Sequence, residues 1–150
     1  MAAITIAETR AVEATATAAG WSEEQLLNLA GERLGRAIGR YFPKPGSVIG
    51  YLGKGHNAGD ALVALRILRD EFGWKIATRN AYPIEECAPL TRKKWQELCL
   101  AAPLDESPGW RDLATPLVLL DGLLGSGTRG ALRAPLVQLA AEMAALRQHA

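Results

Sequence analysis

The 150-residue chain lacks any apolar run of the roughly 18–20 residues that a membrane-spanning helix needs. Its first residues place no basic stretch before an apolar one, and Glu8 interrupts them early, so we expect no signal peptide. An excess of one charge is missing too: with 17 basic and 16 acidic residues, the net charge of +1 gives no reason to expect nucleic acid or an anionic membrane as a partner. We therefore expect a soluble cytoplasmic protein.

Cysteine is scarce. Cys87 and Cys99 are the only two, and we expect both on one helix, roughly 18 Å apart at about 1.5 Å per residue. This separation is too long for a disulfide, and the spacing is that of neither a zinc site nor a redox pair. We expect unreactive thiols.

The sequence instead shows strands alternating with helices. Thr5-Ile6-Ala7-Glu8 and Ser22-Glu23-Glu24-Gln25 fit the S/T-x-x-E/Q capping box and predict two N-terminal helices, ending at Gly20 and near Tyr41. The other expected elements are a strand over 48–52, a helix ending at Gly73, a strand over 74–78, a helix over 85–101, an irregular connection over 103–116, a strand over 117–120 and a helix over 134–147. Pro89 indicates that the helix over 85–101 either starts late or is kinked. Such alternation implies right-handed crossovers. We predict one α/β domain over residues 1–150, a Rossmann-like doubly wound parallel sheet with helices on both faces and two N-terminal helices.

Two glycine-rich loops carry the strongest functional signal. Gly53-x-Gly55-x-x-Ala58 and Gly125-x-Gly127-x-x-Gly130 both match G-x-G-x-x-G/A directly after an expected strand. Such loops aim backbone N–H groups and a positive helix end at an anionic ligand. An NAD-dehydrogenase is not indicated, because the second strand ends in Thr78-Arg79-Asn80, without a carboxylate for the ribose. The ATP-binding pattern G-x-x-x-x-G-K-[ST] is absent.

Polar side chains accompany both loops. We expect Asp60 at a helix start and Asp121 as the last residue of a buried strand. If the third strand lies beside the first, both loops open into one crevice containing Asn57, Asp60 and Asp121. That set suits a hydroxylated ligand, a cation or proton transfer. Structural alternatives stay open: Asp60 as a helix cap, His56 as a solvated residue and Asn57 as a turn former.

Basic residues leave further alternatives. Lys54 and Arg129, which lie in the glycine loops, would either contact phosphate or be solvated. The run Arg92-Lys93-Lys94 indicates a solvated helix face.

At these loops the chain resembles the NAD(P)H-hydrate epimerase family, the YjeF N-terminal domain. The family's first motif, roughly G-x-G-N-N-G-G-D-G-L-V-A-A-R, corresponds to GKGHNAGDALVALR at 53–66. Its second, roughly V-D-A-L-L-G-T-G-x-x-G-x-x-R-x-P, corresponds to LDGLLGSGTRGALRAP at 120–135, and a weaker L-M-E-x-A-G corresponds to LLNLAG at 26–31. Three motifs in this order make the resemblance specific.

The resemblance implies an enzyme that interconverts the R and S hydrates of NADH and NADPH (NADHX and NADPHX), with one K⁺ per site. Asn57 and Asp121 would contribute to the K⁺ site, and Asp121 would be the acid/base carboxylate. The residues implied in substrate binding are His56, Asn57, Ala58, Gly59 and Asp60. Those implied in wrapping the substrate phosphates are Gly125, Ser126, Gly127, Thr128, Arg129, Gly130 and Ala131.

The chain departs from the family pattern at three loop positions and at its end. His56 replaces an asparagine, and Ala58 and Ala61 replace glycines. The family continues with a further strand and a D-I-P-S-G-type motif, which the chain, ending at Ala150, does not reach, so we expect a domain truncated at its C-terminal end. In many bacteria the family domain is fused to a hydrate dehydratase, which is therefore a possible partner domain or protein.

Two other functions fit the same residues. One is a non-catalytic nucleotide-binding or dimerisation module of this fold, and the other is a regulatory domain that senses nucleotides. A sheet that ends after its third strand leaves an edge and apolar helix faces uncovered, so we expect a homo-oligomer.

Overall fold

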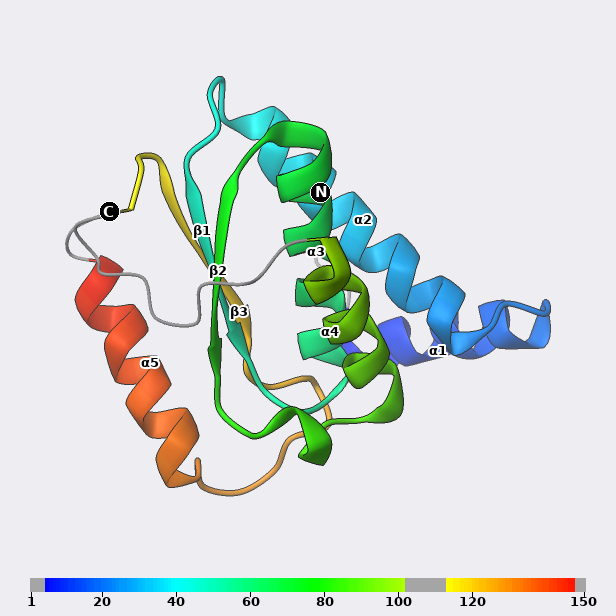
Figure 1. Ribbon diagram of the computed structural model, residues 1–150. Coiled ribbons are helices and arrows are strands. Elements are labelled where there is room, and N and C mark those ends of the chain that lie inside the picture. Colours follow the sequence, from blue (N-terminus) through cyan, green and yellow to red (C-terminus); the bar gives the residue numbers. More distant parts are fainter. Residues whose placement is uncertain (1–4, 102–112, 148–150) are drawn as a thin grey trace.

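The computed structural model describes residues 5–101 and 113–147 as a three-stranded parallel sheet with helices on both faces (Figure 1). In chain order the elements are α1 (Ile6–Ala18), α2 (Glu23–Tyr41), β1 (Ser47–Leu52), α3 (His56–Phe72), β2 (Lys75–Asn80), the 3₁₀ helix η1 (Ile84–Glu86), α4 (Pro89–Ala101), β3 (Leu117–Gly122) and α5 (Ala134–Arg147). The predicted Rossmann-like α/β fold with two N-terminal helices is confirmed. Within the described ranges, no helix is both long and apolar enough to cross a membrane.

β1 is the central strand of the sheet. β2 and β3 pair with it on opposite sides, both parallel to it. Leu52 lies opposite Asn80 of β2 and opposite Gly122 of β3, so the three strands end at one edge. Because the chain crosses from one side of β1 to the other, the strand order reverses at β1, and ligands of open α/β sheets bind at such a reversal.

The side chains of β1 alternate between two apolar layers. Val48 and Leu52 pack in the layer with α3, whereas Ile49 and Tyr51 pack in the layer with α5. Figure 1 shows α2, α3 and α4 on one side of the sheet and α5 on the other. Both faces of the central strand are therefore covered, as the apolar composition of parallel strands requires.

α5 is fixed to the sheet by a polar anchor as well as by apolar packing. The Tyr51 hydroxyl donates a hydrogen bond of 2.9 Å to Glu142 Oε1, and Arg79 Nε donates one of 2.8 Å to the same oxygen. Burial, followed by the Glu142 hydrogen bond, raises the pKa of Tyr51, so its phenol remains a donor. The anchor joins β1, β2 and α5.

α2 lies close to α3 because glycines form its contact face. A Cβ atom on Gly31 would lie 2.5 Å from the carbonyl oxygen of Asp60, and one on Gly35 would lie 2.8 Å from that of Ala64. Real side chains are not found at such distances, so these positions require glycine. The close approach brings the first half of α2 beside the start of α3.

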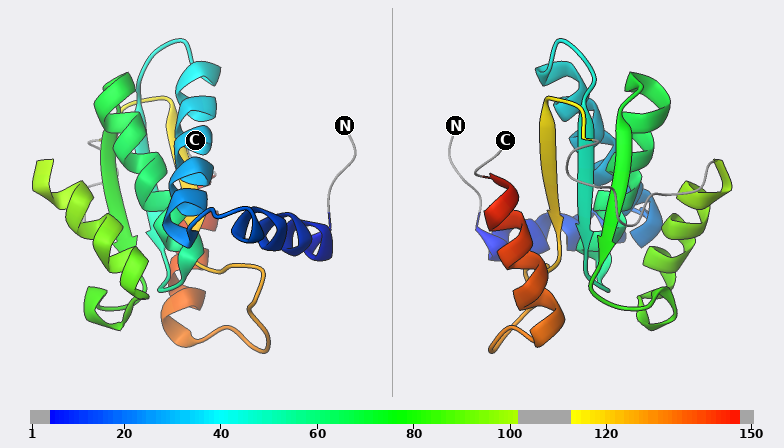
Figure 2. Two further views of the ribbon diagram at one scale, coloured as in Figure 1. Left: turned by 90° about the vertical axis from the view of Figure 1, so that its right-hand side faces the viewer. Right: turned by 60° about the vertical axis from the view of Figure 1, so that its left-hand side comes forward.

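α1 projects from the rest of the molecule (Figure 2). None of its residues is buried. Its start is stabilised by the predicted capping box, in which Glu8 N donates to Thr5 Oγ1 (3.2 Å) and Thr5 N donates to Glu8 Oε2 (2.6 Å). The second predicted box, Ser22 with Gln25, is also present at the start of α2. α1 is therefore stabilised by local hydrogen bonds rather than by packing.

Several predicted boundaries shift in the structure. β2 covers Lys75–Asn80 rather than 74–78, and the connection predicted over 103–116 lies mostly outside the described residues. α4 begins at Pro89 rather than at residue 85, which is the late start that Pro89 indicated, because proline fits a first helical turn but lacks the N–H that an interior position needs. Cys87 consequently precedes α4, and the prediction that it shares a helix with Cys99 is wrong. Neither cysteine forms a disulfide, and burial raises the pKa of the Cys87 thiol.

Candidate functional site

The first glycine loop is shorter than the sequence predicts. β1 ends at Leu52 and α3 begins at His56, with Gly55 as its N-cap. Residues 56–60, which the sequence indicated as a turn, are therefore helical. The interpretation of Asp60 as a helix cap is wrong, because Asp60 lies in the second turn and no side chain caps α3.

Because residues 56–60 are helical, Ala58 and Gly59 face the core. Ala58 is fully buried in the layer between α3 and the sheet, and Gly59 is buried against Leu27 of α2. No non-glycine residue in the described part of the chain has a positive φ, so Ala58 is not strained. The methyl group that replaces a family glycine at position 58 therefore lies in the core rather than against a ligand.

The two glycine loops touch at the end of the sheet. Gly53 N donates a hydrogen bond of 3.0 Å to Gly122 O, and a side chain on Gly53 would collide with the carbonyl group of Leu123. Asn57 then bridges the loops, since its Nδ2 donates to Leu124 O at 3.0 Å and to Asp121 O at 3.4 Å. The predicted meeting of Asn57 and Asp121 is confirmed.

Asp121 is more open than the sequence indicated. β3 continues to Gly122 and lies at the sheet edge, so Asp121 is exposed rather than buried. Its Oδ1 accepts a hydrogen bond of 3.0 Å from Leu123 N. Oδ2 has no hydrogen-bond partner among the described residues. One carboxylate oxygen is thus oriented by the backbone and the other is available to a ligand.

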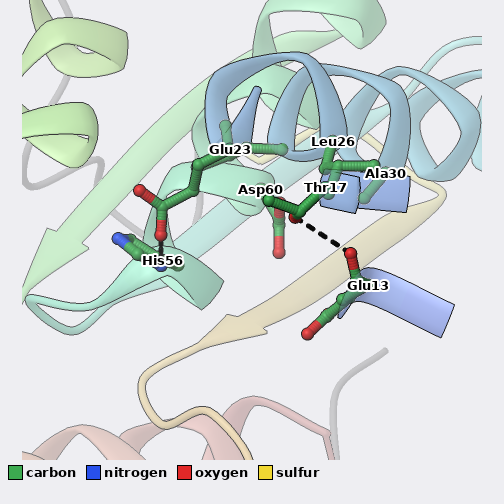
Figure 3. A pocket seen from close by; sticks show the side chains of 8 residues that line it. Glu13, Thr17, Glu23, Leu26, Ala30, His56 and Asp60 are labelled. Atoms are coloured by element: carbon green, nitrogen blue, oxygen red, sulfur yellow. Dashed lines mark hydrogen bonds and ion pairs between the residues drawn. The ribbon is translucent and has the colours of Figure 1, made fainter. Parts of the chain in front are cut away.

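Asp60 opens into a different pocket, here called the acidic pocket. It has a volume of about 390 Å³ and is lined from α1, α2 and α3 by Glu13, Thr17, Glu23, Leu26, Leu27, Ala30, His56 and Asp60 (Figure 3). No described residue of the second glycine loop lines it. Asp60 therefore does not share with Asp121 the crevice in which the sequence placed both.

The charges in the acidic pocket affect one another. His56 Nδ1 lies 3.2 Å from Glu23 Oε1, a contact drawn in Figure 3. Burial raises the pKa of Asp60 to about 6; the nearby His56 opposes this rise and Glu13 adds to it. Asp60 therefore exchanges a proton close to neutral pH.

A second hollow, here called the basic groove, lies between the two glycine loops. Its volume is about 360 Å³, and its lining residues are Lys54, Gly55, Tyr82, Leu123, Leu124, Gly125, Thr128, Arg129, Ala131, Leu132, Arg133 and Leu136. The lining contains three cations and no carboxylate. The remaining second-loop residues implied by the resemblance, Ser126, Gly127 and Gly130, are exposed in the same loop but do not line the groove. Figure 1 shows this loop, in orange, running from β3 to α5.

The segment before α4 supports the first loop, which the sequence did not indicate. Ala88 N donates to Lys54 O at 2.8 Å, and Thr91 Oγ1 donates to Gly55 O at 3.0 Å. Lys94 was expected on a solvated face, but its side chain is 3% exposed and lies 2.7 Å from Glu24 Oε1. That expectation is wrong for Lys94 because its partner comes from α2, which no local pattern reveals.

The described residues contain no group of three or more His, Cys, Asp or Glu side chains placed to bind a metal ion. A cation at this end of the sheet would therefore need amide and carbonyl oxygens. At this end of the sheet Asn57 Nδ2 donates to the carbonyl oxygens of Asp121 and Leu124, and the Asp121 carboxylate is exposed beside them. Amide, carbonyl and carboxylate oxygens are the types of ligand that suit a hard cation.

Comparison with known proteins gives a consistent picture. Residues 23–149 match the family described as YjeF-related protein N-terminus. The NAD(P)H-hydrate epimerase of Plasmodium knowlesi is 32% identical over 123 residues, covering 80% of this chain and 42% of that protein. The bifunctional NAD(P)H-hydrate repair enzyme Nnr of Hyperthermus butylicus is 32% identical over 145 residues, covering 89% of this chain and 26% of that protein. The enzyme of the same name from Coxiella burnetii is 32% identical over 137 residues, covering 88% and 27%.

The chain thus spans less than half the length of these relatives. The family match runs from the start of α2 past the end of α5, so it includes both glycine loops, Asn57 and Asp121, and leaves α1 outside. The chain belongs to the family of YjeF-related protein N-terminal domains.

Proposed function

We propose that this chain is an isomerase that interconverts the R and S hydrates of NADH and NADPH. The observation that carries the proposal is the bridge from Asn57 to the carbonyl groups of Asp121 and Leu124, which joins two dinucleotide-type loops at a reversal of strand order. The names of the relatives support it. The basic groove suits the phosphates of a dinucleotide, and the adjoining Asn57 and Asp121 suit its hydroxylated ring.

Asp121 is the proposed acid/base residue. The hydrate carbon of the nicotinamide ring bears a hydroxyl group beside the ring nitrogen, so inversion requires that hydroxyl to leave and return on the other face. A carboxylic acid donates a proton as the C–O bond breaks and water departs, while the nitrogen lone pair forms the C=N bond. Water then adds to the opposite face and returns the proton to the carboxylate. The available Oδ2 of Asp121 suits this role.

K⁺ is proposed as the cofactor, held by Asn57 and Asp121. An amide oxygen and a carboxylate oxygen are ligands of the type that a hard monovalent cation takes. When bound, K⁺ would supply a fixed positive charge beside the substrate hydroxyl. The residues of this chain would orient the ring against Asp121, while His56 and Asp60 line the separate acidic pocket.

The test is epimer interconversion followed by NMR, starting from purified R-NADPHX with K⁺ and compared with the spontaneous rate. We expect the wild-type chain to exceed that rate and Asp121→Asn to lose the excess, because the amide keeps the shape but cannot transfer the proton. Asp70→Asn, at the far end of α3, is the matched control and should remain active. Full activity of Asp121→Asn would refute its role. A wild-type rate at background with nucleotide still bound would instead indicate a non-catalytic binding module.

We also propose a partner activity, an oligomeric state and a cellular location for this chain. Relatives named bifunctional repair enzymes support a second activity, for which we propose a hydrate dehydratase domain or protein. We propose a homo-oligomer, because β3 has no neighbour on its outer side among the described strands. We also propose a cytoplasmic location.

A further inference from the structure

The basic groove has cations on both of its walls. Arg129 and Arg133 come from the second loop, and Lys54 comes from the first. Within the described part of the chain, none of the three forms an ion pair with a carboxylate. The chain as a whole is nearly neutral at +1, so this concentration of positive charge is local.

The surrounding backbone adds to the positive potential. α3 and α5 both begin at the groove, and neither has an acidic residue in its first turn. A helix N-terminus behaves as about half a positive charge. Arg133 lies directly before α5 and therefore adds to the positive potential at the start of that helix, where an acidic residue would reduce it. An anionic ligand would relieve this repulsion.

The number and placement of the cations indicate which anion. The pyrophosphate of a dinucleotide carries about two negative charges near neutral pH, which the two arginines of one wall balance. Lys54, from the first loop, carries a third positive charge. NADPH differs from NADH by one further phosphate, on its adenosine ribose, and a phosphate monoester carries about −1.5 to −2 near neutral pH. The groove thus offers a separate charge for a separate phosphate.

Lys54 is held in place from two sides. Its ammonium group lies 5.0 Å from the centroid of the Tyr82 ring, within the range of a cation–π contact. Its carbonyl oxygen accepts the 2.8 Å hydrogen bond from Ala88 N. The backbone and the charged end of Lys54 are therefore both positioned at the groove, which reduces the entropy that binding a phosphate would cost.

We propose that Lys54 binds the ribose phosphate and makes this groove select NADPHX over NADHX. The inference rests on the proposed function and states which of its two substrates the site prefers. The ring of Tyr82 keeps the lysine at the groove, and the arginines of the second loop bind the pyrophosphate common to both substrates.

The experiment titrates the whole chain with NADPH and with NADH and follows the fluorescence of the reduced nicotinamide. We expect the wild-type chain to bind NADPH about fivefold more tightly than NADH, which corresponds to the roughly 1 kcal/mol that one partly exposed charge pair contributes. Lys54→Met should bind both ligands with the affinity of NADH, and Lys54→Arg should keep the preference. Lys44→Met, an exposed lysine between α2 and β1, is the matched control and should keep it too.

Equal affinities in the wild-type chain, or a preference that survives Lys54→Met, would overturn the inference. Because binding is measured without turnover, the two proposals fail separately. Selective binding without epimerisation refutes the enzyme alone, whereas epimerisation with unselective binding refutes the role of Lys54 alone. Binding of neither nucleotide refutes the role of Lys54, and the epimerisation assay decides the proposed function separately.

Discussion

Asp60→Asn should stabilise the folded chain at alkaline pH. Burial raises the pKa of Asp60 from its ordinary 3.8 to about 6, against the opposing effect of His56 and with the help of Glu13. Glu23 is the other acidic residue of the pocket. Between about pH 4 and 6 the folded chain thus holds more protons than the unfolded chain, so stability falls as pH rises through this window.

The size of the effect follows from that shift. About two pKa units correspond to about 3 kcal/mol at 1.36 kcal/mol per unit. Asp60 is only partly buried, and solvent screening reduces this to about 1–2 kcal/mol. Asparagine keeps the size of the side chain and removes the charge. The free energy of unfolding should therefore rise by that amount at pH 8 and change little at pH 4, where Asp60 is mostly protonated in the folded chain.

Urea unfolding at pH 4 and pH 8 measures the difference. Asp121→Asn is the control, because the Asp121 side chain is exposed at the sheet edge, and its stability should follow the wild-type dependence on pH. A variant Asp60→Asn that is no more stable than wild type at pH 8 would show that burial of this carboxylate carries no cost, and the reasoning would fail.

Two further predictions concern stability and assembly. Tyr51→Phe should lower the free energy of unfolding by about 1 kcal/mol in urea, because it removes the hydrogen bond to Glu142 that anchors α5; an unchanged value would show that Arg79 alone maintains the anchor. Light scattering at high protein concentration should give a mass above that of the 16.1 kDa chain, since β3 offers an unpaired edge; a strictly monomeric mass would refute self-association.

Features that depend on neighbouring residues could be predicted from the sequence. Both capping boxes form as expected, because each needs only a side chain and a backbone N–H three residues apart. Gly73 ends α3 as expected, since its φ of +69° is one that glycine adopts readily. The crevice between the loops was also predicted, because parallel strands that alternate with helices end at one edge.

Features that depend on distant residues could not be predicted in this way. Gly59 looks like a turn residue, yet it is helical because it packs against Leu27 of α2, a helix that lies elsewhere in the sequence. The burial of Lys94 depends on Glu24, and the exposure of Asp121 depends on β3 lying at the sheet edge. The basic groove joins residues of both loops and of the chain after β2, a combination that no single window of sequence contains.

α1 projects from the rest of the molecule (Figure 2), yet it supplies one wall of the acidic pocket, whose other walls come from α2 and α3. A helix of 13 residues with no buried side chain is marginally stable by itself. It contributes Glu13, which repels the ionised form of Asp60. Glu13 therefore adds to the burial that favours the protonated form of Asp60. A helix that buries none of its own side chains thus still alters the chemistry of a carboxyl group on another helix.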